Sequence, residues 1–477
     1  MHRNILLVLG AVAIGCGLRF IVDLEPNWIF AWFLPGLLLA LALRADPWPA
    51  RGLIALAAAI GVTVNVPFFL KVMPVVPVIV VMASQTLLWV LIYSGARRIV
   101  TRYPTAWSVL ALPVIVVGAD TLLAYVTPDG NWGSLAYTQT EALPVAQLAA
   151  FGGVPAILFV LMLANSAIAL ALTHGTKLRG AWVAYGGTVL VLAASIGFGA
   201  ARLQAAPAQA SGTPVAFGIA AVDDFVPGPR SEQSRDVWEQ YDAQVLLLAG
   251  SGAKIIVLPE KIDVLKSADA EARKAHLAAL ARDNHVWLVA GLGVDNGTER
   301  RNEAWWFAPD GRQITNYLKH FMAPPEREFV SGSEYPVNDI EGLRYGVAIC
   351  KDMHFARLGR AFGARDAAVM LVPAWDFDDD AWLAANMTKL RGVESGYSVV
   401  RSSRNGLLSI SDPYGRYLAV ERSAKLPGTT LFDRVKVGPR VATLYSTIGD
   451  VPGWICVAGL ALLLALGLRK TGTVPVS

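Results

Sequence analysis

Long apolar runs separated by short polar stretches fill the first 200 residues and return once near the end of the chain. A helix that crosses a lipid bilayer needs roughly 20 consecutive, mostly apolar residues. Two neighbouring runs, the third and fourth, lie close together around Pro67 and Pro74. We therefore predict a polytopic α-helical membrane domain with eight spans, at about residues 4–22, 28–44, 52–70, 74–94, 106–126, 152–173, 181–200 and 451–468.

The apolar runs become shorter after an Ala/Pro/Gln-rich linker at 201–212. Short apolar runs typical of strands are followed by stretches with helical periodicity, the first of which Ser231 could cap. Alternating strands and helices predict an α/β sheet. The expected organisation is a membrane domain at 1–200, a linker at 201–212, an α/β domain at 213–445, and a membrane helix with a short tail at 446–477.

The composition agrees with several membrane spans. Hydrophobic residues make up 54% of the 477 residues and charged residues only 16%, whereas a soluble protein carries about 25% charged residues. The net charge of +4 is small, and no basic cluster is interleaved with aromatic residues. The chain therefore gives no indication of nucleic-acid binding.

The charges of the loops predict an orientation, because basic loops stay on the cytoplasmic side of a membrane. With eight spans, the loops on the other side hold Asp23, Glu25, Lys71, Asp129 and Glu141. Both termini should then be cytoplasmic and residues 201–450 should lie outside, with these basic residues on the cytoplasmic side: Arg3, Arg44, Arg51, Arg97, Arg98, Arg102, Lys177, Arg179, Arg469 and Lys470.

The first apolar run has a second interpretation. Arg3 followed by an apolar stretch and Ala13-Ile14-Gly15-Cys16 is similar to a lipoprotein signal peptide with its cleavage site. The apolar run continues past Cys16 to Val22, however, and seven further spans follow it. We favour a retained membrane helix.

One cysteine lies outside the long apolar runs. Cys350 ends the apolar run 343–350, whereas Cys16 and Cys456 sit inside expected membrane helices. Two polar groups follow similar short runs: Glu260 after Pro259, and Lys319 before a Pro-rich segment. A thiol that attacks an acyl group needs a base and a cation for the oxyanion. Each residue alone also fits a plain structural explanation, a buried free cysteine or a solvated surface charge.

Other catalytic chemistries lack their signatures. The six histidines form no i,i+3 or i,i+4 pair, which argues against zinc. A possible calcium loop that starts at Asp376 has Ala381 and Met387 where Gly and Glu are required. There is no G-x-S-x-G elbow. We expect no metal and no cofactor, and Cys350 is the best-supported nucleophile.

Glu260, Lys319 and Cys350, in this order, resemble the Glu-Lys-Cys triad of the nitrilase superfamily. The resemblance extends downstream through the segments 371–376, 390–395, 399–406 and 412–416. With membrane spans on both sides, the chain is similar to the apolipoprotein N-acyltransferase family. That resemblance implies that the α/β domain is a nitrilase-like α-β-β-α sandwich and carries the catalytic site. It also implies a monomeric protein of the bacterial inner membrane, with this catalytic domain on the periplasmic side.

The resemblance also implies the reaction. An acyl chain would pass from a phospholipid to Cys350 as a thioester, and then to the α-amine of a diacylglyceryl-cysteine apolipoprotein. Glu260 would act as the base and Lys319 would stabilise the oxyanion. Two alternatives stay open: a membrane-anchored amidase that uses water as acceptor, and a catalytically silent relative that binds lipid or protein.

Supporting residues follow from the same comparison. The family has a second essential Glu after the lysine, and the flanks Phe329-Val330 favour Glu328 over its competitor Glu326. Lys351 and Asp352 stand where the family has an aromatic residue and Glu, so Lys351 either lowers the pKa of Cys350 or points to solvent. Trp375 and Asp376 are expected near the thiol, and the acids after residue 375 either help to position it or form a solvated turn.

Two further segments are expected to serve the substrate. The loop at 127–151 contains Trp132, Tyr137 and Gln139, and a similar Tyr-x-Gln loop in the family favours substrate binding over an interfacial aromatic anchor. The segment 321–335, rich in Pro, Gly and charge, is expected to be mobile and to gate lipid access.

Overall fold

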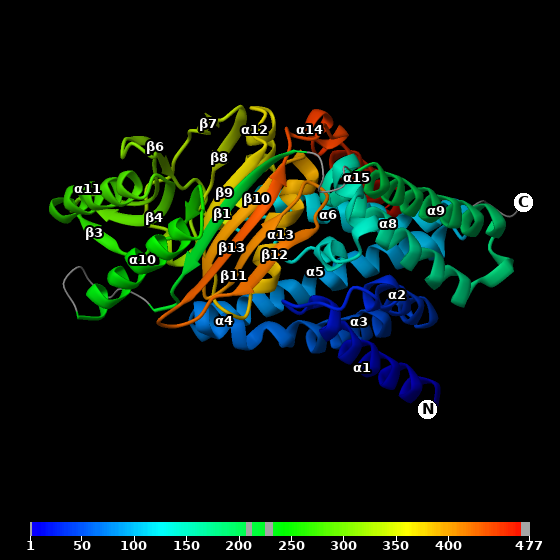
Figure 1. The fold of residues 1–477 in the computed structure, drawn as a ribbon. Coiled ribbons are helices and arrows are strands. Elements are labelled where there is room, and N and C mark those ends of the chain that lie inside the picture. Colours follow the sequence, from blue (N-terminus) through cyan, green and yellow to red (C-terminus); the bar gives the residue numbers. More distant parts are fainter. Residues whose placement is uncertain (1, 207–211, 225–231, 469–477) are drawn as a thin grey trace, which may run out of the picture. The chain divides into compact units, whose positions relative to one another are not determined.

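The computed structural model describes residues 2–206, 212–224 and 232–468. The chain divides into two units (Figure 1). The first comprises Met1–Leu148, Gly152–Ala200 and Asp450–Ser477, and the second comprises Ala149–Phe151 and Ala201–Gly449. The expected linker starts inside a helix, because residues 201–205 continue the helix that precedes it. Residues 207–211 of the linker and the expected cap Ser231 lie outside the described residues.

The first unit is helical. Within the described part of the chain, seven helices are long and apolar enough to cross a membrane, so this is a multi-pass membrane protein. Its helices are α1 (His2–Val22), α2 (Leu34–Arg44), α3 (Pro47–Val62), α4 (Val66–Val72), α5 (Val75–Arg102), α6 (Ala111–Val126), α7 (Leu143–Ala146), α8 (Leu148–Thr173), α9 (Ala181–Ala205) and α15 (Val451–Leu468). The third and fourth expected spans are separated at Met73-Pro74, between α4 and α5.

The expected span at 28–44 is shorter than the others. It consists of a 3-10 turn (Phe30–Trp32) and α2, which together form the apolar helix Phe30–Arg44. The backbone is broken at Phe33, and Asn165 of α8 satisfies the groups exposed there. Its amide oxygen accepts from the Gly36 N–H at 2.7 Å and its nitrogen donates to the Ala31 carbonyl at 2.9 Å. Such internal partners are required because lipid offers none.

Basic side chains tie several helix ends together at one end of the helical unit. Arg3 of α1 donates to the Arg44 carbonyl at the end of α2, at 2.7 Å. Arg44 in turn donates to the carbonyl of Leu172 near the end of α8, at 2.9 Å. Arg98 of α5 donates to the Gly467 carbonyl of α15, at 2.7 Å. The start of α1 and the ends of α2 and α8 therefore lie together at the same end of the helical unit.

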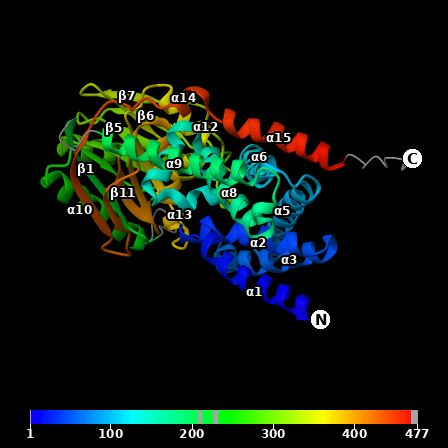
Figure 2. The same cartoon turned by 90° about the vertical axis from the view of Figure 1, so that its right-hand side faces the viewer.

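Small residues allow the membrane helices to pack closely. Figure 2 shows α15 running beside α6. Gly118 of α6 lies against the backbone of α15, because a Cβ at this position would be 2.9 Å from the Cys456 carbonyl oxygen. A larger residue would push the two helices apart, and small residues at such contacts are typical of membrane helix pairs.

The second unit contains two β-sheets. One has seven strands in the order β13-β1-β2-β4-β5-β6, with β3 on β4, and the other has six in the order β12-β11-β10-β9-β8-β7. Figure 1 shows β13 beside β1, the two strands farthest apart in sequence. The strands are β1 (Thr213–Ala221), β2 (Ile255–Val257), β3 (Val264–Lys266), β4 (Trp287–Asp295), β5 (Arg300–Phe307), β6 (Gln313–Leu318), β7 (Val337–Ile340), β8 (Leu343–Val347), β9 (Val369–Trp375), β10 (Ser398–Arg404), β11 (Leu407–Ser411), β12 (Tyr417–Arg422) and β13 (Thr429–Val437).

Apolar side chains of both sheets meet in one core, to which Phe217, Val257 and Trp306 contribute from the first sheet and Val347 and Leu371 from the second. Helices cover the outer faces, which confirms the predicted α-β-β-α sandwich. They are α10 (Glu232–Gly250) and α11 (Ser267–Asp283) over the first sheet, and α12 (Ala356–Gly363) and α13 (Ala381–Ser395) over the second, with the short α14 (Leu444–Ile448) after β13.

Candidate functional site

Three strands end next to one another and deliver the three residues expected to form the triad. Glu260 follows β2, Lys319 follows β6 and Cys350 follows β8. The carboxyl ends of parallel strands are the usual place for a site in an open α/β sheet. Gly291 of β4 makes room for the first of these turns, since a Cβ there would lie 2.6 Å from the Glu260 Cα atom.

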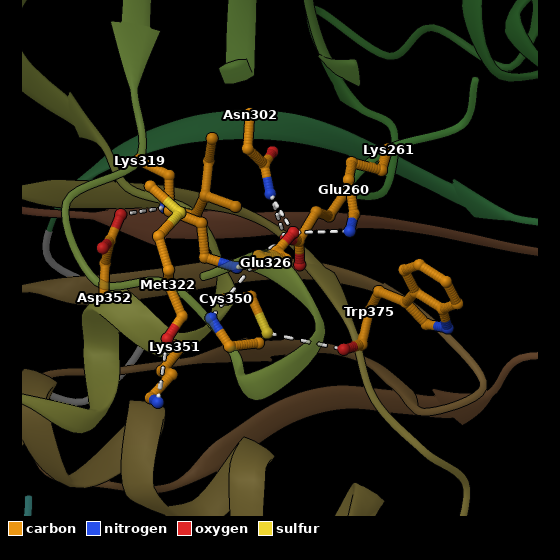
Figure 3. A network of polar contacts seen from close by, with 12 residues as sticks. Glu260, Lys261, Asn302, Lys319, Met322, Glu326, Cys350, Lys351, Asp352 and Trp375 are labelled. Atoms are coloured by element: carbon orange, nitrogen blue, oxygen red, sulfur yellow. Dashed lines mark hydrogen bonds and ion pairs between the residues drawn. The ribbon is translucent and has the colours of Figure 1, made fainter. Parts of the chain in front are cut away.

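Lys319 and Glu260 form a fully buried ion pair. The ammonium Nζ lies 2.6 Å from Glu260 Oε1 and 2.7 Å from Glu326 Oε2 (Figure 3). Burial lowers the pKa of Lys319, but the two carboxylates outweigh burial and hold that pKa well above its usual value. Lys319 therefore remains a cation that is shared by two acids.

Asn302 also joins the two carboxylates, and sequence analysis did not identify it. Its Nδ2 atom donates to Glu260 Oε1 at 2.6 Å and to Glu326 Oε1 at 2.8 Å. Its carbonyl accepts from the Lys319 N–H at 2.9 Å, so strand pairing between β5 and β6 fixes both residues. The available signal was an asparagine beside an apolar strand, where this residue type is disfavoured.

Cys350 begins a 3-10 turn (Cys350–His354) and has a positive φ of 43°. Few residues other than glycine adopt this conformation, which is common at functional sites. The thiol donates to the Trp375 carbonyl at 3.5 Å. Burial, and next the charge of Glu260, raise the pKa of Cys350 well above its usual value, although Lys319 opposes them. These influences favour the protonated thiol of Cys350 over the thiolate.

Asp352 connects the loops that carry Lys319 and Cys350. Its Oδ1 accepts from the backbone N–H groups of His320 and Phe321, and its Oδ2 accepts from the Tyr317 hydroxyl and the Ile349 N–H. Burial raises the pKa of Asp352 to about 6. These four hydrogen bonds fix the positions of both loops relative to each other.

Asp376 anchors the end of β9 next to the thiol. Arg401 donates to both of its carboxylate oxygens, at 2.9 and 2.5 Å, and Ser403 donates to Oδ2 at 2.9 Å. Gly406 allows this arrangement, because a Cβ there would be only 2.1 Å from the Asp376 Oδ2 atom. Asp376 is therefore buried and paired, and of the two interpretations from sequence a solvated turn does not apply to it.

The two glutamates after the lysine lie in different surroundings. Glu326 is buried, and its oxygens meet Lys319 and Lys261. Burial would raise the pKa of Glu326, but these two cations lower it to about 2. The Glu328 side chain is 83% exposed and its nearest cation is Arg300, at 3.5 Å. Glu326 turns inward at the end of a 3-10 turn (Pro324–Glu326), which favours it over Glu328 by geometry, and the choice of the essential glutamate stays a prediction.

Lys351 does not point to solvent. The residue is 6% exposed, and its Nζ donates to the Met322 carbonyl at 3.0 Å. This contact connects the turn after Cys350 to the segment 321–335. Two backbone hydrogen bonds also hold this segment: the Val330 N–H donates to the Arg300 carbonyl, and the Gly332 N–H donates to the Lys319 carbonyl. Its expected mobility stays a prediction.

The three expected substrate-binding residues of the loop at 127–151 lie in the helical unit. Gln139 is buried; it accepts from Trp32 Nε1 at 2.9 Å and donates to the Trp28 carbonyl at 3.0 Å. The buried Tyr137 donates its hydroxyl to Asn131 at 3.0 Å. The ring of Trp132 stacks on Phe68, with 5.6 Å between centroids. These contacts give all three residues a packing role, and their part in substrate binding stays a prediction.

Among the residues that the structure describes, no group of three or more His, Cys, Asp or Glu side chains is arranged to hold a metal ion. The charged groups of the site are instead paired with one another, carboxylate to ammonium, which suits proton transfer to and from a thiol.

Comparison with known proteins gives two family matches. The Carbon-nitrogen hydrolase family model matches residues 227–425, and the model of the Apolipoprotein N-acyltransferase N-terminal domain matches residues 17–167. A solved structure, an amidase from Nesterenkonia sp., is 21% identical with a TM-score of 0.41 and covers 48% of this chain and 92% of its own.

Curated relatives match along most of the chain. The apolipoprotein N-acyltransferase of Geobacter metallireducens is 25% identical over 402 residues, 76% of this chain and 74% of the relative. That of Bradyrhizobium diazoefficiens is 24% identical over 437 residues, 79% of this chain and 76% of the relative. With both domains matched in the expected order, the chain belongs to the apolipoprotein N-acyltransferase family of the nitrilase superfamily.

Proposed function

We propose that this protein transfers an acyl chain from a phospholipid to the α-amine of the N-terminal diacylglyceryl-cysteine of apolipoproteins. The names of its relatives and the membrane unit support this proposal. The observation that carries it is the buried network in which Lys319 lies 2.6 Å from Glu260, beside the only described cysteine of the sandwich unit. Base, cation and nucleophile are thus available together.

In the first step, Glu260 accepts the proton of Cys350 while the sulfur attacks the carbonyl carbon of the phospholipid ester. Because the pKa of Cys350 is raised, the thiolate forms as the attack proceeds and not beforehand. The ammonium of Lys319 stabilises the oxyanion of the tetrahedral intermediate. The intermediate collapses to a thioester, and the leaving alcohol of the lysophospholipid takes the proton from Glu260.

In the second step, the neutral α-amine of the apolipoprotein attacks the thioester carbon. Glu260 accepts a proton from the amine, and Lys319 again stabilises the oxyanion. The carbon–sulfur bond breaks, the amide leaves, and the proton on Glu260 returns to the sulfur. Because both substrates are lipids, a membrane unit on the same chain brings them to the thiol.

Hydrolysis is the second candidate, because the same residues would serve water as the acceptor. The lipid forms of cellular lipoproteins distinguish the two. In cells that contain this protein, mass spectrometry should find lipoprotein N-termini with three acyl chains, and in cells without it only two. If lipoprotein N-termini carried only two acyl chains in both kinds of cell, the transferase proposal would be refuted and hydrolysis would be the remaining candidate.

We further propose that residues 201–450 face the periplasm and both termini the cytoplasm. Arg3 and Arg44 meet at one end of the helical unit, and Arg97 of α5 donates to carbonyls at the end of α2 there. These contacts support the proposal, because basic residues favour the cytoplasmic side. The start of α1 and the end of α2 lie there together, so the short helix returns the chain to that side. That gives an even number of crossings.

A reporter that is active only outside the cytoplasm tests this orientation. Fused after Gly250 it should be active, and fused after Lys470 it should be silent. The same reporter fused after Arg44 should also be silent if the short helix completes a crossing. Activity after Arg44 or Lys470 would contradict the proposed orientation.

A further inference from the structure

Lys261 is a buried cation that the triad does not account for. It directly follows Glu260, has a positive φ of 44° and is 8% exposed. Its Nζ lies 2.5 Å from Glu326 Oε1. The same ammonium lies 4.9 Å from the ring centroid of Trp375 and 5.4 Å from that of Phe329 (Figure 3 shows the first of these rings). Such distances are within the range of cation–π attraction.

The charges of the network balance only when Lys261 is included. Glu260 and Glu326 bring two negative charges, and Lys319 brings one positive charge that both share. Lys261 supplies the second positive charge. An uncompensated charge in a buried site is strongly unfavourable, so without Lys261 one acid would be driven towards its neutral form.

We propose that Lys261 is a positioning residue for the reaction: its ion pair fixes Glu326 as a carboxylate, so that Lys319 stays divided between Glu326 and Glu260. This inference rests on the proposed function, since it concerns the proton transfer from Cys350. If Glu326 became neutral, Glu260 would be the one remaining carboxylate paired with the Lys319 ammonium, and their attraction would be stronger. A carboxylate held more tightly by its counter-ion accepts the thiol proton less readily.

The proposal has a consequence for the pH dependence. Glu326 is faced by Lys319, Lys261, Asn302 and the backbone N–H of Ala323, with Glu260 sharing two of these partners. The two lysines lower the pKa of Glu326 against the effect of burial. Loss of one lysine must raise that pKa. Activity that needs the Glu326 carboxylate is then lost as the pH falls through the raised value and recovered above it.

The experiment uses the full-length protein in phospholipid vesicles. The rate of acyl-Cys350 formation is measured by mass spectrometry between pH 5 and 9 for the wild type, Lys261→Met and Lys261→Arg. Methionine keeps an apolar stem against the rings of Trp375 and Phe329 but removes the charge. Lys266→Met is the matched control, because that lysine is 62% exposed and pairs with Asp295 outside the network.

We expect Lys261→Met to be slower than wild type by about tenfold or more at pH 5, with the difference shrinking towards pH 9, because burial that Lys261 no longer opposes raises the pKa of Glu326 into the measured range. Lys261→Arg and Lys266→Met should follow the wild-type profile. Recovery at high pH also shows that the variant is folded.

Three results would overturn the inference. They are an unchanged profile in Lys261→Met, an equal loss at every pH, and a Lys261→Arg profile that coincides with that of Lys261→Met. Each of these leaves the proposed function intact if the wild type still forms the thioester. A wild type that forms no acyl-Cys350 overturns the proposed function, and the role of Lys261 falls with it.

Discussion

Replacing Cys350 by alanine is expected to abolish formation of the acyl-enzyme. The thiol is the only group at the junction of β8 and its 3-10 turn that can form a thioester, and Glu260 and Lys319 have no covalent role. The substitution removes only the sulfur, and the ion pairs of the neighbouring network do not involve it. The protein should therefore stay folded while the acyl increment on the peptide that contains residue 350 disappears.

The other two cysteines provide matched controls. Cys16 lies in α1 and Cys456 in α15, both in helices long enough to cross a membrane. Cys16→Ala and Cys456→Ala should form the acyl-enzyme at the wild-type rate when the purified variants are incubated with phospholipid. An acyl group found on Cys16 or Cys456, or a thioester that persists in Cys350→Ala, would refute the assignment of the nucleophile.

A large effect is also expected for Glu326→Gln. Glutamine has nearly the same shape as glutamate, but it cannot neutralise Lys319 and Lys261, which contact the two carboxylate oxygens of Glu326. Removing one partner of a buried ion pair commonly costs about 3–5 kcal/mol. The remaining positive charge is then directed at Glu260. We expect acyl-enzyme formation to slow by about 100-fold, comparable to the loss of a general acid–base group.

Glu328→Gln is the comparison that makes this result specific. The two glutamates are two residues apart, but the Glu328 side chain is 83% exposed and its ion pair with Arg300 is a single contact of 3.5 Å. Exposed ion pairs contribute little. Single-turnover rates and melting temperatures of both variants should show a loss for Glu326→Gln alone. Equal losses in both variants, or a loss in Glu328→Gln only, would show that the carboxylate in the network is not the one required.

The sequence could predict which residues of the site follow the ends of strands. An apolar run that stops at Pro259-Glu260, and another that stops at Cys350-Lys351, indicate side chains at a sheet edge. The alternation of strands and helices predicted an α/β sheet, and these features depend on local periodicity, which the sequence expresses directly. The two-sheet sandwich was expected from the family resemblance alone.

The rest of the network depends on how loops turn, and no local pattern expresses that. Glu326 and Glu328 have similar surroundings in sequence, and only the 3-10 turn before Glu326 directs it inward. Asn302 reaches the site because β5 pairs with β6 in the register that places its carbonyl opposite the Lys319 N–H. Lys261 lies in the site because its backbone adopts a left-handed conformation that nothing in the sequence marks.

In the membrane unit, too, local sequence patterns predicted some features, and others depend on residues far apart in the chain. Apolar run length located each of the seven long helices, because a single property of the residues sets it. The break at Phe33 was not visible in the run at 28–44, since its cause is a polar side chain more than 130 residues later, Asn165, which bonds to the backbone on both sides of the break.

The raised pKa of Cys350 has a consequence for the chemical survival of the thiol if the sandwich unit faces the periplasm, as proposed above. Oxidants, alkylating agents and disulfides react with the thiolate, and the thiol is far less reactive. Burial and the charge of Glu260 keep the sulfur in the thiol form. Under the proposed orientation and mechanism, the protein could carry this cysteine in an oxidising compartment without a reductant to restore it, because the thiolate would form only while the acyl ester is bound against the sulfur.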